Sequence, residues 1–248
     1  MKNPLVVSLP ETDSTNAEMH RRMSLVSDLS HGTTVVAEYQ TAGRGQQGNR
    51  WESQAGMNLT FTLLLRPCHI AAAQSFILSQ LVSLSIVEVL DRYFLGTVIK
   101  WPNDIYYGDS KLAGILIENR LQGETLDSSI VGIGLNVNQL KFPSSLSNPV
   151  SLSQIIGHSV DREELLSLLV ETISRTVADY IPTDEPAVAD RYRASLYRGK
   201  GFYPYFDLLA QEPVRAEIAG VDSSGVLSLR TESGEIRRYL FKEVQYCL

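Results

Sequence analysis

The most restrictive feature of this sequence is a set of predicted strands joined by very short turns. Apolar and β-branched residues predict strands over 98–101 running on to 107, over 111–121 and over 130–137. The turns between them are YGDS (107–110) and the pair QG (122–123). A crossover between parallel strands takes about a dozen residues or more. The sequence therefore predicts a mostly antiparallel sheet.

Helices and further strands are predicted around this sheet. Strands are expected over 5–9, 33–38 and 59–65, and helices over 15–23, 70–93, 163–180 and 187–197. The letters TNAE (15–18) have capping-box spacing, which opens the first helix at Thr15. Residues 140–149 predict an irregular connection. The predicted fold class is α+β, a mixed sheet with flanking helices.

The C-terminal part of the chain has a different pattern. After GKG (199–201), short strands alternate with tight turns at DSSG (222–225) and ESG (232–234). This pattern predicts a small β-barrel domain over 199–248. A domain of about 50 residues buries too little surface to be stable alone, so it should pack against the larger domain over 1–198.

The charge balance and the apolar segments exclude several classes of protein. The 22 Lys and Arg against 28 Asp and Glu give a net charge of −6, without the basic excess that DNA binding uses. Gln80 and Glu88 interrupt the apolar stretch 75–90, and the apolar run 5–9 is too short for a secretion signal. Cys68 and Cys247 lack a disulfide framework and metal-type spacing. A cytoplasmic protein without DNA or membrane partners is expected.

The sharpest local motif is GRGQQG (43–48), which is flanked by Gln40 and Trp51. Three glycines in six positions let backbone amides approach a ligand, and Arg44 adds a charged donor suited to a carboxylate or a phosphate. The motif is neither a Walker loop nor a dinucleotide-binding fingerprint. It predicts an anion cradle, with a merely flexible hairpin as the alternative.

Two further motifs place polar groups at strand ends. The first is KWPND (100–104) followed by KLAGI (111–115), in which Asp104 can ligate Mg²⁺ or pair with a lysine and Asn103 can read an adenine edge. For Lys111 taken alone, the alternative interpretation is a strand residue that simply faces solvent. The second motif is GIGLN (132–136). Glycines within a strand indicate either the close approach of a ligand or backbone, or a β-bulge.

Together these motifs resemble the biotin protein ligases. DSTN (13–16), the segment 38–51, KWPND with KLAGI, and GIGLN follow the order and spacing of that family. The resemblance implies a sheet like that of class II aminoacyl-tRNA synthetases and a Src-homology-3-like C-terminal barrel. It also implies a two-step reaction: biotin and MgATP give biotinyl-5′-adenylate, and a lysine of a biotin carboxyl carrier domain, such as that of acetyl-CoA carboxylase, then takes the biotin.

The resemblance also implies a role for each matching residue. Lys111 and Arg44 would be catalytic, acting electrostatically on the biotin carboxylate and the α-phosphate. Biotin would be bound by these two together with Ser14, Thr15, Gln40, Gly43 and Gly114. The nucleotide would be bound by Arg44, Gly45, Asn103, Asp104 and Asn136. Mg²⁺ would be held by Asp104, and the glycine-rich loop would close over the adenylate.

Two departures from the family pattern qualify these implications. Gln46 stands where the family often has a second arginine, which predicts weaker retention of the adenylate. The catalytic pattern begins about five residues into the sequence, so a ligase without a DNA-binding repressor domain is expected. A strand edge near 117–121 could pair between two subunits, so the sequence does not decide between a monomer and a homodimer.

Two other functions compete with this interpretation. A lipoate ligase or octanoyl transferase shares a related fold, but it needs a long apolar groove and no ureido-binding groups. A non-catalytic biotin or nucleotide sensor would keep the pocket and use the barrel as an adaptor. Activity towards biotin, lipoate and octanoate separates the three.

Overall fold

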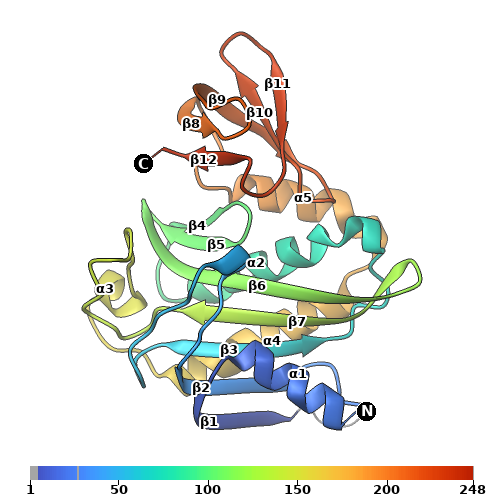
Figure 1. The fold of residues 1–248 in the computed structure, drawn as a ribbon, viewed down its shortest axis with the longest axis vertical. Coiled ribbons are helices and arrows are strands. Elements are labelled where there is room, and N and C mark those ends of the chain that lie inside the picture. The colour runs from blue at the N-terminus through green and yellow to red at the C-terminus, as the bar shows by residue number, and fades with distance from the viewer. Residues whose placement is uncertain (1–4, 27, 248) are drawn as a thin grey trace.

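The larger of the two sheets contains seven strands (Figure 1). The computed structural model describes residues 5–26 and 28–247 of the chain. The strand order is β1-β2-β3-β7-β6-β5-β4. The strands are β1 Val6–Thr12, β2 Thr34–Gln40, β3 Leu59–Leu65, β4 Thr97–Lys100, β5 Asp104–Tyr107, β6 Ser110–Gln122 and β7 Thr125–Leu135. Every neighbouring pair is antiparallel except β1 with β2, which run parallel. The prediction of a mostly antiparallel sheet is confirmed.

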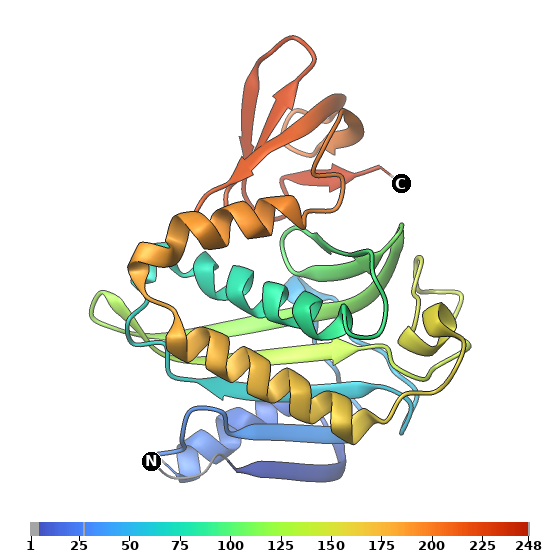
Figure 2. The ribbon, with the colours of Figure 1, turned by 180° about the vertical axis from the view of Figure 1, so that it is seen from behind.

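Helices cover both faces of this sheet. They are α1 Thr15–Leu25, α2 Phe76–Leu90, α3 Leu152–Ile156, α4 Arg162–Asp179 and α5 Glu185–Ala194. Helix α1 makes the crossover between the parallel strands β1 and β2, while α2 and α4 pack together on the opposite face (Figures 1 and 2). None of the helices in the described ranges is long and apolar enough to cross a membrane.

A second, smaller sheet forms the C-terminal part of the structure. Its strands are β8 Tyr203–Asp207, β9 Glu212–Val221, β10 Leu227–Thr231, β11 Ile236–Tyr239 and β12 Val244–Tyr246. All of its pairings are antiparallel, in the order β11-β10-β9-β8-β12, which is consistent with the expected Src-homology-3-like barrel. The domain boundary at 198/199 stays a prediction.

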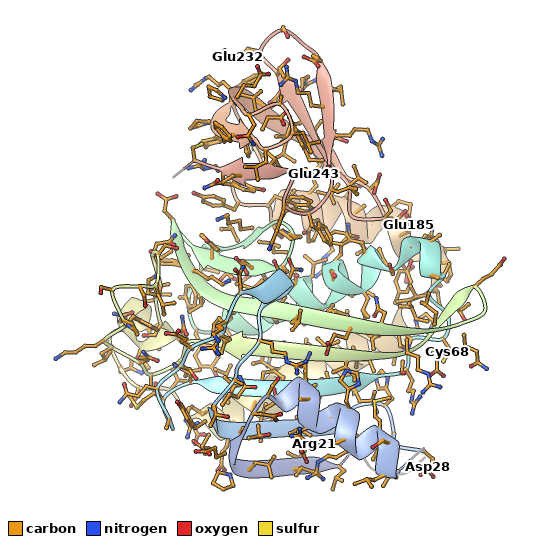
Figure 3. All side chains as sticks on the ribbon, in the orientation of Figure 1. Arg21, Asp28, Cys68, Glu185, Glu232 and Glu243 are labelled. Atoms are coloured by element: carbon orange, nitrogen blue, oxygen red, sulfur yellow. The ribbon has the colours of Figure 1, made fainter. Side chains whose placement is uncertain are left out.

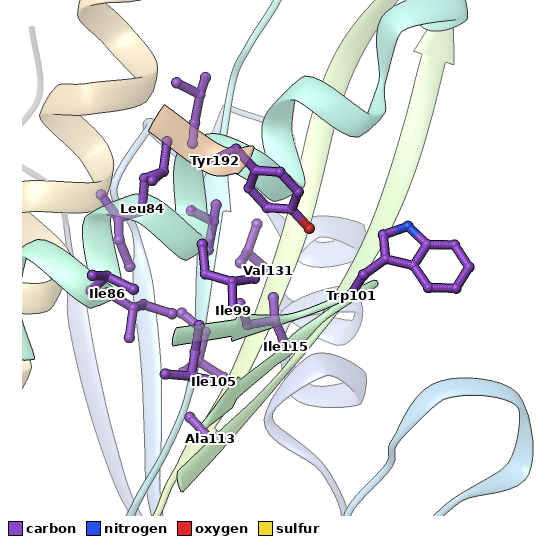
Figure 4. Packing of buried hydrophobic residues seen from close by; sticks show 14 of the residues in the cluster. Leu84, Ile86, Ile99, Trp101, Ile105, Ala113, Ile115, Val131 and Tyr192 are labelled. Carbon is purple, nitrogen blue, oxygen red and sulfur yellow. The ribbon is translucent and has the colours of Figure 1, made fainter. Parts of the chain in front are cut away.

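A continuous apolar core joins the two sheets. Helix α2 is buried on nearly all sides because it packs on the large sheet with α4 on one side and α5 on the other (Figure 2). Figure 4 shows part of the apolar packing around this helix. Its Leu84 and Ile86 belong to the same cluster as Ile99 of β4 and Tyr205 of β8. The indole N–H of Trp101 donates to the carbonyl of Gly225 in the small sheet, over 3.0 Å. The two parts of the chain therefore share one core.

The structure corrects three local predictions. The strand expected to run from 98 to 107 is a hairpin, with Lys100 opposite Asp104, because Pro102 has no N–H for the ladder. The helix expected from residue 70 begins at Phe76, after a short 3₁₀ turn at Ala72–Gln74. Helix α3 was not predicted, although Ser151 and Gln154 form a capping box at its start.

The capping box expected at the start of helix α1 does not form. The N-cap is Ser14, without a side-chain cap, and the hydroxyl of Thr15 donates instead to Gln40. Glu18, the other half of the expected box, pairs with Arg21 and Arg22 further along the helix. The Thr15 hydroxyl is thereby directed into the sheet rather than onto its own helix.

The two cysteines are free thiols, as expected. Cys68 lies after the end of β3, and Figure 3 shows it at one end of the strands of the large sheet, away from the small sheet. Within the described residues, no group of three or more His, Cys, Asp or Glu side chains is arranged to hold a metal ion.

Candidate functional site

A cavity of about 220 Å³ lies over the large sheet and collects most of the predicted residues. We call it the site cavity. Its walls come from the start of α1, the end of β2, the glycine loop (residues 43–51), the β4–β5 turn, and strands β6 and β7. The predicted residues that line it are Ser14, Thr15, Gln40, Arg44, Gly45, Asn103, Asp104, Lys111 and Gly114. Groups distant in sequence thus meet at one place.

One end of the site cavity is a buried network of hydroxyl and amide groups. Ser14, Thr15 and Asn16 are each at most 4% exposed. Gln40 Oε1 accepts from the Thr15 amide at 2.7 Å and from its hydroxyl at 3.1 Å. Thr62 Oγ1 lies 2.8 Å from Thr15 Oγ1 and 2.6 Å from Asn16 Oδ1. Such a fixed set of donors and acceptors can select a small polar ring by its hydrogen-bonding pattern.

The other end of the site cavity holds an ion pair. Lys111 Nζ lies 2.7 Å from Asp104 Oδ1, and the two side chains are 33% and 19% exposed. Strands β5 and β6 pair side by side there, which brings the two motifs together. Lys111 is therefore not the solvated strand residue of the alternative interpretation. It is a fixed, half-buried cation.

Lys100 and Trp101 of the same motif turn away from the site cavity. Lys100 Nζ donates to the Tyr106 hydroxyl and lies over the Tyr106 and Tyr246 rings. Burial lowers the pKa of Lys100; Asp104 partly offsets this, while Lys111 and Arg198 lower the pKa further. These two residues therefore support the turn that carries Asn103 and Asp104.

The glycines of β7 make room for side chains that cross the strand. A Cβ on Gly132 would lie 2.2 Å from Asn16 Oδ1, and one on Gly134 would lie 2.2 Å from the indole of Trp51. The register of β7 with both neighbours is continuous across these glycines, so the bulge alternative is wrong. The groups that approach the strand closely are the side chains of Asn16 and Trp51, whereas a ligand or another backbone was expected. Because these glycines have no side chains, the Trp51 ring can pack directly against the backbone of β7.

Trp51 forms the roof over this part of the sheet. Its ring also comes within 3.5 Å of the position of a Cβ on Gly114 in β6. The Trp51 indole N–H is buried and finds no hydrogen-bond partner within the described part of the chain. A buried donor without an acceptor is costly, so a bound ligand that supplied an oxygen there would gain affinity.

Two predicted site residues do not line the site cavity. The backbone of Gly43 accepts from the Trp51 amide at 3.1 Å, and a Cβ there would lie 2.3 Å from the Trp51 carbonyl oxygen, so Gly43 forms the base of the glycine loop. Asn136 is 4% exposed and donates to the carbonyl of Val150 at 3.1 Å. Its role towards adenine stays a prediction that this geometry does not support.

The structure adds lining residues that sequence reasoning did not assign. Asn16, Asn49 and Arg50 stood in quoted motifs without a role, whereas Lys242 stood in none. With Arg44 and Lys111, the basic lining side chains number four, against the single carboxylate of Asp104. The site cavity is therefore suited to an anionic ligand.

Comparisons with known proteins agree with this geometry. Residues 9–136 match the biotin/lipoate A/B protein ligase family. The chain is 33% identical to the biotin–[acetyl-CoA-carboxylase] ligase of Paracoccus denitrificans, over 91% of this chain and 94% of that relative. It is 32% identical to the bifunctional ligase/repressor BirA of Bacillus spizizenii over 84% of this chain, and it spans 64% of that relative's length.

The similarity extends to solved structures. The fold superposes on the biotin protein ligase from Aquifex aeolicus in complex with biotin and ATP with a TM-score of 0.78, at 28% identity. The match covers 98% of this chain and 99% of that chain, so it includes both sheets.

Proposed function

Because the chain belongs to the biotin/lipoate A/B protein ligase family, we propose that it attaches biotin to a lysine of a carrier domain through biotinyl-5′-adenylate. One observation carries the proposal: the site cavity joins a buried hydroxyl and amide network to the Lys111–Asp104 ion pair. The first part matches a ureido ring, and the second matches a carboxylate that meets a phosphate. Relatives named as biotin ligases favour the same function.

The ureido ring of biotin offers two N–H donors and one carbonyl acceptor. Thr15 and Gln40 present a hydroxyl and an amide group that are already oriented by the hydrogen bonds between them, and Ser14 lines the same part of the site cavity. Little side-chain entropy is lost when such a preorganised set binds its ligand. This end of the site cavity therefore selects biotin.

Adenylation brings together two groups that repel each other. The biotin carboxylate forms a bond to the α-phosphorus of ATP, and the bond from that phosphorus to the bridging oxygen breaks, with its electron pair leaving on pyrophosphate. Lys111 and Arg44 supply positive charge where the two anions meet, which lowers the barrier without any proton transfer. Both residues line the same cavity, as this role requires.

The nucleotide end of the site cavity also fits a magnesium ion. Mg²⁺ is usually held by one or two carboxylates together with substrate phosphates, and Asp104 is the carboxylate that lines this cavity. The ion would neutralise phosphate charge when ATP is bound. Asp104 itself holds Lys111 in place through the 2.7 Å ion pair.

In the second step a carrier lysine amine attacks the acyl carbon of the adenylate. The carbon–nitrogen bond forms, AMP leaves, and the amine loses a proton. Trp51 and the glycine loop cover the site cavity and exclude the water that would hydrolyse the intermediate. The carrier we propose is a biotin carboxyl carrier domain, and we place the reaction in the cytoplasm, where ATP is available.

A homodimer is part of the same proposal. Strand β6 pairs with β5 only from Ser110 to Gly114, so residues 116–122 have no strand partner on that side within the described chain. An unpaired edge offers backbone donors and acceptors to another strand. Analytical ultracentrifugation with and without biotin and ATP tests whether two copies pair through it.

The decisive test is pyrophosphate release with MgATP and, in turn, biotin, lipoate or octanoate at micromolar concentration. Release with biotin alone, followed by transfer to the lysine of a carrier domain, is expected. Release with lipoate or octanoate would instead assign the chain to another branch of the family. Binding without release for any acid would favour the sensor.

The Gln46→Arg variant is expected to retain the adenylate longer. Gln46 lines the site cavity, and an arginine there would give the phosphate a charge-assisted hydrogen bond about twice as strong as a neutral one. We expect biotinyl-adenylate release to slow by about fivefold to tenfold, measured by rapid-mixing fluorescence. Gln54→Arg adds the same charge outside this cavity and is the control. An unchanged release rate would remove the role of position 46.

A further inference from the structure

A buried asparagine connects the site cavity to a carboxylate that lies outside it. Asn16 is 3% exposed and lines the cavity. Its Nδ2 donates to Glu118 Oε2 in strand β6 at 2.8 Å, while its Oδ1 lies 2.6 Å from Thr62 Oγ1 in strand β3. Strand β7 lies between β3 and β6, so the Asn16 side chain bridges its two neighbours.

The strand register makes room for this bridge. Thr62 of β3 pairs with Gly132 of β7, which in turn pairs with Leu116 of β6. Glu118 follows two residues later, on the same face of β6 as Leu116. A Cβ on Gly132 would collide with the Asn16 amide. The amide of Asn16 therefore fills the space that a side chain of β7 would otherwise take.

Glu118 is separated from the site cavity by Asn16. Its side chain is 35% exposed and lines a different cavity, of about 260 Å³, together with His20. His20 Nε2 lies 3.3 Å from Oε2 of Glu118, the oxygen that also accepts from Asn16. His20 stands one helical turn after Asn16 in α1, so this helix directs two side chains at one carboxylate. Glu118 can thus act on a ligand in the site cavity through Asn16.

The chemistry of these groups fixes the direction of each hydrogen bond. A carboxylate can only accept, so Glu118 requires the amide nitrogen of Asn16 to face it and leaves the amide oxygen towards Thr62. That oxygen can also only accept, so the single proton of the Thr62 hydroxyl goes to Asn16 and not to Thr15. The Thr15 proton is held between Gln40 Oε1 and Thr62 Oγ1. The lone pairs of Thr15 Oγ1 then remain for the ligand.

We propose that Glu118 is a positioning residue that sets Thr15 to accept a hydrogen bond from a ring N–H of biotin; this rests on the function proposed above. If the Asn16 amide were reversed, its nitrogen would face Thr62. The Thr62 proton would then go to Thr15 and compete with the ring N–H for the same oxygen. Glu118 opposes that arrangement because two acceptors would face each other. The residue therefore favours a ligand with N–H donors over an acid without them.

The test measures the binding of biotin and of ATP to the full chain by calorimetry. Glu118→Leu removes the acceptor at a partly exposed strand position and frees the Asn16 amide to turn. We expect the Kd for biotin to rise about tenfold, the effect of one lost hydrogen bond, while the Kd for ATP is unchanged. In steady-state kinetics the KM for biotin should rise in the same proportion while kcat stays within about twofold of the parent.

A matched control uses the same substitution further along the chain. Glu124 is exposed in the turn that follows β6 and does not line the site cavity. Glu124→Leu should change neither Kd. Melting temperatures show whether each variant folds. Equal loss of biotin and ATP affinity in Glu118→Leu, or no loss of biotin affinity, would overturn the role of Glu118.

A reciprocal pair of substitutions separates hydrogen-bond direction from packing. Asn16→Asp leaves two carboxylates facing each other and should weaken biotin binding at least tenfold. Adding Glu118→Gln supplies a donor from the other side and keeps an acceptor towards Thr62, so the double variant should bind biotin at least fivefold more tightly than Asn16→Asp alone. A double variant that binds biotin no better than Asn16→Asp contradicts the proposal.

The outcomes also distinguish this inference from the proposed function. If the parent chain binds biotin but releases no pyrophosphate with it, the ligase function fails, and the Kd values still decide the role of Glu118. If the parent releases pyrophosphate with biotin but the variants bind biotin as the parent does, the positioning role alone fails. A parent chain that does not bind biotin overturns both.

Discussion

Replacing Lys111 by alanine is expected to lower biotin-dependent pyrophosphate release by roughly 10²–10³-fold, the usual effect of removing one preorganised group that stabilises a transition state. Lys111 lies 2.7 Å from Asp104 in a partly buried site, where water screens charge poorly. Its loss leaves the biotin carboxylate and the α-phosphate to repel each other, and leaves Asp104 without its partner. The rate of ATP–pyrophosphate exchange measures the effect.

Two companion variants make this result interpretable. Lys111→Arg keeps the charge but changes its geometry and should recover part of the rate. Lys141→Ala removes an exposed lysine that does not line the site cavity and should leave the rate unchanged. Melting temperatures show whether each protein folds. If the Lys111→Ala protein folds and its exchange rate falls by less than fivefold, the catalytic role of this residue is refuted.

The second large effect is expected from Gly134→Ala. An alanine Cβ would lie 2.2 Å from the indole of Trp51, so the ring must leave its place on the strand. Displacing the roof of the site cavity should weaken biotin-dependent ATP turnover at least tenfold in kcat/KM, and overpacking of this kind typically costs about 1–3 kcal/mol of stability. Steady-state kinetics and denaturant unfolding measure the two quantities.

The chain offers a matched control for this substitution. Gly220 also lies in a strand, β9, and a Cβ there would meet nothing within 4 Å. Gly220→Ala should leave both stability and kinetics near those of the parent. In a Trp51→Ala background, Gly134→Ala should cost little further stability, because the ring it collides with is gone. Full additivity of the two substitutions would contradict the packing argument.

Local pattern and turn chemistry were sufficient to predict most of the large sheet. Short turns at 107–110 and 122–123 required antiparallel neighbours, and the strands formed accordingly. The hairpin at 101–103 was missed because apolar residues continue on both sides of it. The capping box at Thr15 was a local expectation that a distant group overrode, since Gln40 captures the hydroxyl.

The residues of the candidate site also fall into those that the sequence predicted and those that it could not. Residues within contiguous motifs, such as Lys111, Asp104 and Arg44, were found from the sequence, and the structure brings them into one cavity. Asn136 shares such a motif, but its amide donates to Val150, a partner that spacing cannot reveal. Lys242 stands in no motif, and only the packing of Phe241 on Trp101 brings it to the site cavity.

The hydrogen bond from Trp101 to Gly225 has a consequence for how the chain unfolds. It ties the turn that presents Asn103 and Asp104 to a turn of the small sheet, and both sheets contribute to one core. The two should therefore melt in a single cooperative transition, with similar protection of their buried amides from hydrogen exchange. A substitution that destabilises the small sheet should therefore also disorder the turn that presents Asn103 and Asp104, even when no residue of the site is changed.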